Sequence, residues 1–184
     1  MSIADFVIVR LDPNVDIAPF DCGDTDLNDF WANDATIYQK ERLAVTHLLA
    51  SRAGETTEIA GYFCLLTDKL VFDPSDREKR KFWSTFNKKN KIHFNKHRKT
   101  YPAIKIGRLA VATAFTGKGL GSCLIDHIVA IVIAMNNIGC RFITVDAYKN
   151  AFDFYLKNNF DYLSDDDKNE QTRLMYFDIK RFVS

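Results

Sequence analysis

Cysteine and proline are scarce in this chain of 184 residues, with four copies of each, and glycine occurs eight times. The cysteines (Cys22, Cys64, Cys123 and Cys140) form no C-x-x-C pair and show no metal-ligand spacing, which argues against a zinc site or a disulfide scaffold. We therefore expect no metal, and we expect all four cysteines to be reduced and to act as small core hydrophobes. Because no signal peptide is visible, the expected location is cytoplasmic.

Long hydrophobic runs are also missing. The longest, residues 128–135, is far shorter than the roughly twenty residues that a membrane-spanning helix needs, so no membrane association is expected. The chain has no internal repeat and no low-complexity linker. Its length and ordinary apolar content of 47% predict one domain over residues 1–184 with a sizeable core and an insertion at about 73–100.

Charge is distributed unevenly, although the net charge is only +1. Residues 77–105 contain eleven of the 25 basic residues and one of the 24 acidic residues. This block either binds a polyanion, of which RNA is the leading candidate, or forms a solvated loop, and both interpretations stay open. The helical spacing of Phe82 and Phe86 favours a place in the core over stacking on bases. His93 and His97 are expected in the basic surface, because no nearby acid supports a metal site.

Hydrophobic periodicity and turn residues predict secondary structure along the whole chain. The expected strands are residues 6–11, 44–51, 59–66, 104–111, 141–146 and 173–179. The expected helices are one that begins near Asp24 and three at about 76–87, 119–137 and 151–159. A polar turn at Gly54 and Glu55 predicts an antiparallel hairpin. In the first helix, Leu27, Phe30, Trp31 and Tyr38 share one face and are expected in the core.

The most informative segment is residues 104–124, where a β-branched strand leads into Gly117, Gly119 and Gly121 and then an apolar helix. Glycines let successive N–H groups approach a ligand closely, and the helix start adds unpaired N–H groups and a positive dipole end. This pattern predicts a cradle for a phosphate or pyrophosphate, although a tight turn without a ligand is the simpler alternative. The spacing fits no Walker A loop, because the loop's only lysine lies between glycines. A Rossmann-type nucleotide binder stays open, with Asp146 as its acidic ribose ligand.

The glycine loop resembles motif A of the GNAT superfamily of N-acetyltransferases, which reads Q/R-x-x-G-x-G/A after a strand that ends in a phrase like R-L-A-V. The glycines match, whereas Thr116 replaces the usual Gln or Arg. The resemblance implies that backbone groups at the end of the strand bind the pantetheine arm of acetyl-CoA, namely those of Leu109, Ala110 and Val111. It also implies that the loop binds the pyrophosphate through Thr116, Gly117, Lys118, Gly119, Leu120, Gly121 and Ser122.

A second segment resembles motif B of the same family, A-x-x-x-Y-x-x-x-G-F. Ala151, Tyr155 and Phe160 fall in register, and Asn159 stands at the glycine position. Because asparagine tolerates the left-handed conformation, the helix C-cap is expected to survive this replacement. The family often has an asparagine three positions before the alanine, where this chain has Tyr148, and the nearby Asn150 is the expected coenzyme contact.

The order of the elements, antiparallel strands followed by a β-α-β-α-β unit, resembles the GNAT arrangement. It implies an α/β fold with a mixed, mostly antiparallel central sheet, flanked by helices and splayed between the fourth and fifth strands. The phrase F-D-C-G-x-x-x-L-N-x-F at residues 20–30 and Arg108 resemble a branch that includes toxins of bacterial toxin–antitoxin modules. Those toxins acetylate aminoacyl-tRNA, so charged tRNA is the candidate acceptor and a ribbon-helix-helix antitoxin the candidate partner, with a monomer or homodimer as the oligomeric state.

The resemblance implies that the chain transfers an acetyl group from acetyl-CoA to a primary amine by direct attack in a ternary complex. Tyr155 is expected to give a proton to the departing thiolate, unless it is only a buried aromatic. The N–H of Val111 is expected to polarise the acetyl carbonyl. Arg108 either orients the substrate or pairs with an acid, and no general base is evident. The alternatives are a small-amine or protein N-acetyltransferase and a non-catalytic module that binds CoA or RNA.

Overall fold

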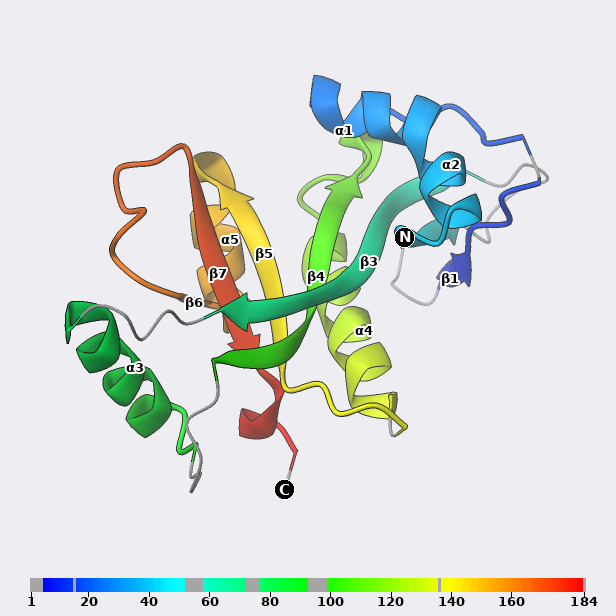
Figure 1. Cartoon of the computed structure of the whole chain (residues 1–184). Helices are drawn as coiled ribbons and strands as arrows, with labels where there is room; N and C mark the ends of the chain where they lie inside the picture. Colours follow the sequence, from blue (N-terminus) through cyan, green and yellow to red (C-terminus); the bar gives the residue numbers. More distant parts are fainter. Residues whose placement is uncertain are drawn as a thin grey trace. The chain divides into compact units, whose positions relative to one another are not determined.

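The computed structural model describes residues 5–14, 16–51, 58–71, 77–92, 99–135 and 137–183. Its strands are β1 (Phe6–Arg10), β2 (Val45–Ser51), β3 (Ile59–Val71), β4 (Thr100–Val111), β5 (Phe142–Tyr148), β6 (Asp161–Tyr162) and β7 (Thr172–Asp178). Its α-helices are α1 (Thr25–Asp29), α2 (Ala35–Lys40), α3 (Arg77–Lys89), α4 (Leu120–Ala134) and α5 (Phe152–Lys157). The strands are hydrogen-bonded in the order β1-β2-β3-β4-β5-β7-β6 (Figure 1).

The sheet is mixed and mostly antiparallel, which confirms the fold class that the sequence predicts. Strands β1 and β2, β2 and β3, β5 and β7, and β6 and β7 pair in antiparallel fashion, whereas β4 and β5 are parallel. The chain forms two compact units. One consists of residues 1–66 and 106–130, and the other of residues 67–105 and 131–184. Both units contain parts of β3, β4 and α4.

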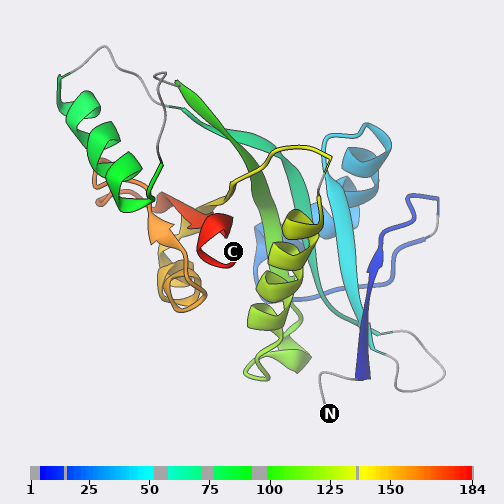
Figure 2. The ribbon, with the colours of Figure 1, turned by 90° about the horizontal axis from the view of Figure 1, so that it is seen from below.

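In the first unit, helices cover both faces of the strands. Tyr62 of β3 donates a hydrogen bond to the carbonyl of Leu27 in α1 at 2.7 Å. The next residue, Phe63, points to the opposite face, where its ring lies 6.2 Å from that of His127 in α4. Figure 2 shows α4 and the α1–α2 pair on different sides of β3. The core beneath α1 and α2 consists of Leu11, Phe30, Trp31, Ala35, Ala44, Ile59, Tyr62, Cys64 and Ala110.

In the second unit, α3 is packed against the sheet by aromatic side chains. The core there consists of Leu70, Trp83, Phe86, Ile92, Tyr101, Ala103, Phe142 and Tyr176. Trp83 and Phe86 of α3 contribute to it, so they are not available to stack on bases. The predicted basic insertion therefore contains a helix that uses its aromatic side for packing.

Two expectations about buried residues are wrong in part. A π-helical turn, Phe30–Asp34, separates α1 from α2 and shifts the helical phase, so that Tyr38 is 39% exposed instead of buried. Of the four cysteines, only Cys64 is buried, and the other three are half-buried.

Element boundaries differ more than element types. Strand β3 runs five residues beyond the predicted end, and the short strand β6 has no counterpart in the prediction. Helix α4 ends at Ala134 rather than at residue 137. The predicted turn at Gly54 and Glu55 and the histidines His93 and His97 lie outside the described residues.

Candidate active site

The glycine loop joins β4 to α4 in the first unit. Gly117 and Gly119 have φ angles of +74° and +76°, in the left-handed region that other residues rarely adopt. A Cβ atom added at either position would meet nothing within 4 Å, so the space beside the loop is open. Helix α4 begins directly afterwards, at Leu120. The loop therefore places an open, glycine-lined backbone at a helix N-terminus.

The backbone amides of this loop have few partners inside the protein. Among the described residues, the N–H groups of Gly117, Lys118 and Gly119 donate to no backbone or side-chain acceptor. The first helical hydrogen bond of α4 runs from Cys123 N–H to the Gly119 carbonyl at 3.2 Å. The amides of residues 120–122 therefore precede the regular hydrogen bonding of the helix, as the first amides of any α-helix do. This is the arrangement that binds an anion.

Side chains of the loop are engaged locally. The Thr116 hydroxyl donates to the carbonyl of Thr113 at 2.9 Å. The Lys118 ammonium donates to the carbonyl of Ala114 at 3.0 Å and lies 4.8 Å from the centre of the Phe115 ring. The loop thus offers mainly its backbone to a ligand.

A turn before α1 holds the chain that leads into this loop. The Asp21 carboxylate accepts hydrogen bonds from Gly23 N–H and the Asn28 amide, both at 2.8 Å, and these bonds lower the pKa of Asp21. The Asn28 side-chain oxygen accepts from Cys22 N–H at 2.9 Å. The Asp21 carbonyl in turn accepts from Thr113 N–H at 3.0 Å. No local signal in the sequence predicts the contact between Asp21 and Thr113, because the two residues are distant in the chain.

Strand β4 loses its pairing with β5 before it reaches the loop. The paired residues are Ala103–Lys105 with Phe142–Thr144, so residues 106–111 continue without β5 as a partner among the described residues. The predicted splay between the fourth and fifth strands stays a prediction, because residues 106–111 and β5 belong to different units. On the β3 side, a Cβ atom at Gly61 would lie 2.7 Å from the Ala110 carbonyl oxygen, so glycine is needed for this close approach. No sequence signal identified Gly61.

Arg108 lies on β4 and points toward α1. Its Nε atom is 3.4 Å from Asp26 Oδ2, and its guanidinium donates to the Gly107 carbonyl at 2.9 Å. The guanidinium also lies 5.3 Å from the centre of the Phe30 ring. Of the two predicted roles for Arg108, pairing with an acid is therefore present in the structure.

The segment that resembles motif B forms α5 in the second unit. Asn159 has a φ angle of +65°, which confirms the predicted left-handed cap. Asn159 N–H donates to the Leu156 carbonyl at 3.1 Å, and Phe160 N–H donates to the Tyr155 carbonyl at 3.0 Å. These two bonds are those of a Schellman motif, which satisfies the last carbonyls of the helix. The cap fixes Tyr155 in the final turns of α5.

Tyr155 is only 6% exposed. The rings of Phe154 and Phe160 lie edge-on to it, with centroids 5.0 and 5.2 Å away. Burial raises the pKa of the Tyr155 phenol well above its ordinary value. Its hydroxyl has no hydrogen-bond partner among the described residues. Tyr155 is therefore a buried phenol that stays protonated at neutral pH.

The remaining predicted contacts lie on the surface of the second unit. Asn150 is exposed in the short turn before α5. Asp146 forms an ion pair with Lys105, with Nζ and Oδ2 2.5 Å apart. The ion pair gives Asp146 a partner within the protein, so a nucleotide is not needed to explain this acidic residue. In addition, the mostly antiparallel sheet differs from the parallel sheet of a doubly wound fold. The Rossmann-type interpretation is therefore wrong.

The described ranges lack two other classes of feature. They contain no cluster of three or more His, Cys, Asp or Glu side chains that could hold a metal ion. None of the helices described is both long and apolar enough to cross a membrane.

Comparison with known proteins places these features in context. Residues 78–162 match the family model described as the acetyltransferase (GNAT) domain. This range includes the glycine loop and the segment from Ala151 to Phe160. A search of curated proteins finds no significant match.

Solved structures with the same fold cover almost the whole chain. A tyrosine-to-phenylalanine mutant of KacT matches with a TM-score of 0.74 and 23% identity, over 96% of both chains. AtaT complexed with acetyl-methionyl-tRNAfMet matches with a TM-score of 0.74 and 23% identity, over 97% of both chains. A mutant AtaT toxin bound to acetyl-CoA and the C-terminus of the antitoxin AtaR has a TM-score of 0.72 and 22% identity, over 98% of this chain and 99% of that one.

Proposed function

Because residues 78–162 match the acetyltransferase (GNAT) domain and the chain shares the fold of KacT, we propose that it transfers the acetyl group of acetyl-CoA to a primary amine by direct attack in a ternary complex. One observation carries the proposal: an open glycine loop with unpartnered amides at the junction between β4 and α4. A diphosphate bears its charge on oxygens that accept hydrogen bonds from such amides, so the loop fits this part of the coenzyme.

The residues that hold acetyl-CoA in this proposal lie on β4 and in the loop. Backbone groups of residues 109–111 bind the pantetheine arm, because this end of β4 leads directly into the glycine loop. The amides of residues 116–122 bind the pyrophosphate. Asn150 adds a polar contact from the turn before α5. Arg108 is a further candidate residue for orienting the acceptor substrate. Its charge is balanced by Asp26.

The bound coenzyme supplies an activated thioester. The N–H of Val111 donates to the acetyl oxygen and stabilises the negative charge that develops there when the amine attacks. As the N–C bond forms and the C–S bond breaks, the Tyr155 hydroxyl gives its proton to the departing sulfur. The proton that the nitrogen loses passes through water and restores the phenol. A protonated phenol is the form that this step needs, and Tyr155 has that form at neutral pH, since an ordinary phenol titrates near pH 10 and burial raises its pKa further.

The acceptor in this proposal is the amino group of an aminoacyl-tRNA, and the chain acts as a toxin. The support is the motif at residues 20–30 together with the shared fold of AtaT, which has been solved with acetyl-methionyl-tRNAfMet. The α-amino group of an amino acid titrates near pH 8, so a large fraction is neutral without a general base. An antitoxin is the proposed partner, as AtaR is for AtaT.

A pair of measurements tests the catalytic proposal. Saturating acetyl-CoA should raise the melting temperature by mass action on the folded state, and the absence of a shift would contradict the coenzyme site. Tyr155→Phe should lower kcat for CoA release with an amine acceptor by about 10²- to 10⁴-fold, with an acetyl-CoA Kd within about threefold of wild type. Tyr38→Phe, at an exposed tyrosine, should leave kcat unchanged. Full activity in Tyr155→Phe would remove the acid role.

A further inference from the structure

Helix α3 and the residues just after it are the most strongly basic described segment of the second unit. Residues 80–92 contain no acid and five basic side chains, namely Arg80, Lys81, Lys88, Lys89 and Lys91. The sequence alone left two interpretations of this block open, a polyanion-binding surface and a solvated loop. The structure separates them by showing how the helix is held.

The inner side of α3 is fixed to the sheet by packing and by hydrogen bonds. Phe86 packs on Phe142 and Tyr176, with ring centroids 5.7 and 5.1 Å away. After the helix, Asn90 is buried and its side-chain amide donates to the Tyr176 hydroxyl at 3.2 Å. The Arg141 guanidinium donates to the Asn90 carbonyl at 2.5 Å. A helix anchored in this way presents its charges on a fixed surface and not on a loose loop.

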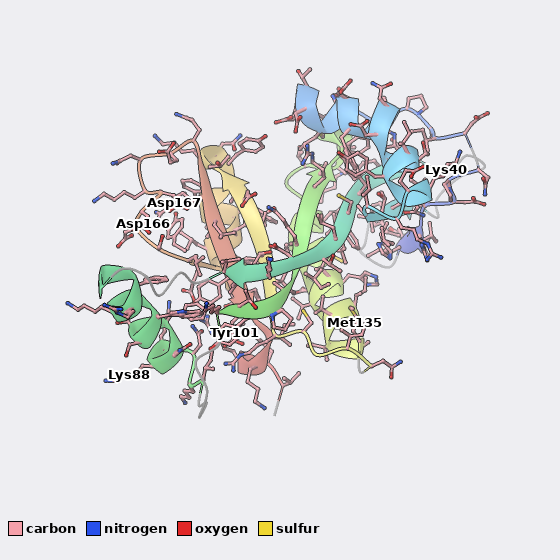
Figure 3. All side chains as sticks on the ribbon, viewed as in Figure 1. Lys40, Lys88, Tyr101, Met135, Asp166 and Asp167 are labelled. Atoms are coloured by element: carbon pink, nitrogen blue, oxygen red, sulfur yellow. The ribbon has the colours of Figure 1, made fainter. Side chains whose placement is uncertain are left out.

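The outer side of α3 carries an exposed stripe, which consists of Lys81, Ser84, Thr85 and Lys88. These residues are three or four positions apart and therefore share one helix face, with the two lysines about 10 Å apart along the axis. Figure 3 shows Lys88 on the side of α3 that faces away from Tyr101. Lys89, next in sequence, pairs with Asp161 at 3.3 Å. Neither Lys81 nor Lys88 forms an ion pair with another described residue.

We propose that this α3 stripe docks the phosphate backbone of an RNA. Lysine and hydroxyl side chains are the groups that contact phosphates, and neither Lys81 nor Lys88 would give up an ion pair with another described residue by binding one. The proposal rests on the proposed function, in which the acceptor amine is carried by a tRNA, and it assigns to α3 the task of holding the nucleic acid. Such contacts are independent of base sequence.

An acidic protein is the other class of partner that a basic stripe could bind. The α3 stripe lacks the apolar and aromatic side chains that such an interface needs. Protein interfaces depend on aromatic and apolar anchors in buried pockets. The aromatic residues of α3 are used inside the unit, since Trp83 and Phe86 are buried and Phe82 packs against the same core. What remains on the outer side is cationic and hydroxylic, which favours phosphate.

The test is binding of deacylated tRNA to the full chain across a salt series, measured by fluorescence anisotropy. The double variant Lys81→Gln/Lys88→Gln should bind several-fold more weakly at low salt, and the slope of log Kd against log salt should fall by roughly 1 to 2, because two phosphate contacts are lost. Glutamine has nearly the same helix propensity as lysine, so α3 is expected to stay folded, as circular dichroism would verify. The control is Lys40→Gln, which removes an exposed lysine of α2 and should change neither value (Figure 3).

Any of the following results would overturn the proposal. An unchanged slope in the double variant, or an equal loss in Lys40→Gln, would show that the α3 stripe does not contact RNA. If polyglutamate of matched charge competes as well as tRNA and loses affinity equally in the double variant, the stripe is a surface for an acidic protein. Acetyl transfer plays no part in this binding measurement. Failure of the stripe is therefore distinct from failure of the proposed activity, which is judged by CoA release.

Discussion

The side-chain amide of Asn28 donates to the Asp21 carboxylate at 2.8 Å, and this bond closes the turn that precedes α1. The carbonyl of Asp21 then accepts from Thr113 N–H, just after β4 ends. The start of the first helix is thereby tied to the segment that leads into the glycine loop. The geometry of the candidate coenzyme site consequently depends on residues about ninety positions earlier in the chain.

Removal of this bond should destabilise the fold. Asn28→Ala removes one of the two donors to the Asp21 carboxylate and leaves the part-buried Cys22 N–H without its acceptor. Loss of the Cys22–Asn28 bond should lower the free energy of unfolding by about 1 kcal/mol in urea denaturation. Asn33→Ala is the matched control, because Asn33 makes an exposed bond to Asp29 across one helical turn. The free energy of unfolding of Asn33→Ala should fall by less than about 0.5 kcal/mol. Equal losses in the two variants would contradict the structural role of Asn28.

Glycine at position 119 should matter to both stability and coenzyme binding. Gly119→Ala places a Cβ atom on a backbone with a φ angle of +76°, at a cost of about 1 to 2 kcal/mol, and the strain should displace the amides beside it. Acetyl-CoA affinity should then fall by roughly tenfold in calorimetry. Gly139→Ala is the control, because Gly139 has open space around it and no left-handed φ angle. The acetyl-CoA affinity of this variant should match that of wild type. Wild-type affinity in Gly119→Ala would argue against the loop as the pyrophosphate site.

His47 should make stability depend on pH. Its ring stacks on Phe63 with centroids 4.8 Å apart, and its Nδ1 atom is buried without a hydrogen-bond partner in the described part of the chain. Burial, followed by the positive charges of His127 and Arg10, lowers the pKa of His47 below 6.5. The unfolded state therefore binds a proton more readily than the folded state, and stability is lost as pH falls below about 6.5.

The measurement is the free energy of unfolding at pH 7.5 and at pH 5.5, for wild type and for His47→Gln. The decrease toward pH 5.5 should be smaller in the variant, since it lacks the group that gains the proton. A decrease of the same size in both proteins would show that His47 is not the source.

Local features were the part of this protein that the sequence predicted well. The strand, glycine loop and helix at residues 104–134 follow from β-branched residues, left-handed glycines and an apolar helix pattern, all of which act within a few residues. The left-handed conformation of Asn159 was likewise predictable, because a helix end needs such a residue and asparagine tolerates it. The position of Tyr38 was not, since a single π-helical turn changes the face on which later residues lie.

The sequence by itself determined the order of the elements, the backbone chemistry of the glycine loop and the existence of a basic block, since each depends on residues close together in the chain. Only the tertiary structure decided what those parts touch. The Asp21–Asn28 turn, the close approach of Gly61 to β4 and the anchoring of α3 by Tyr176 and Arg141 join residues that are distant in sequence. Such contacts form only when the strands pair and the cores close, and no local propensity specifies them.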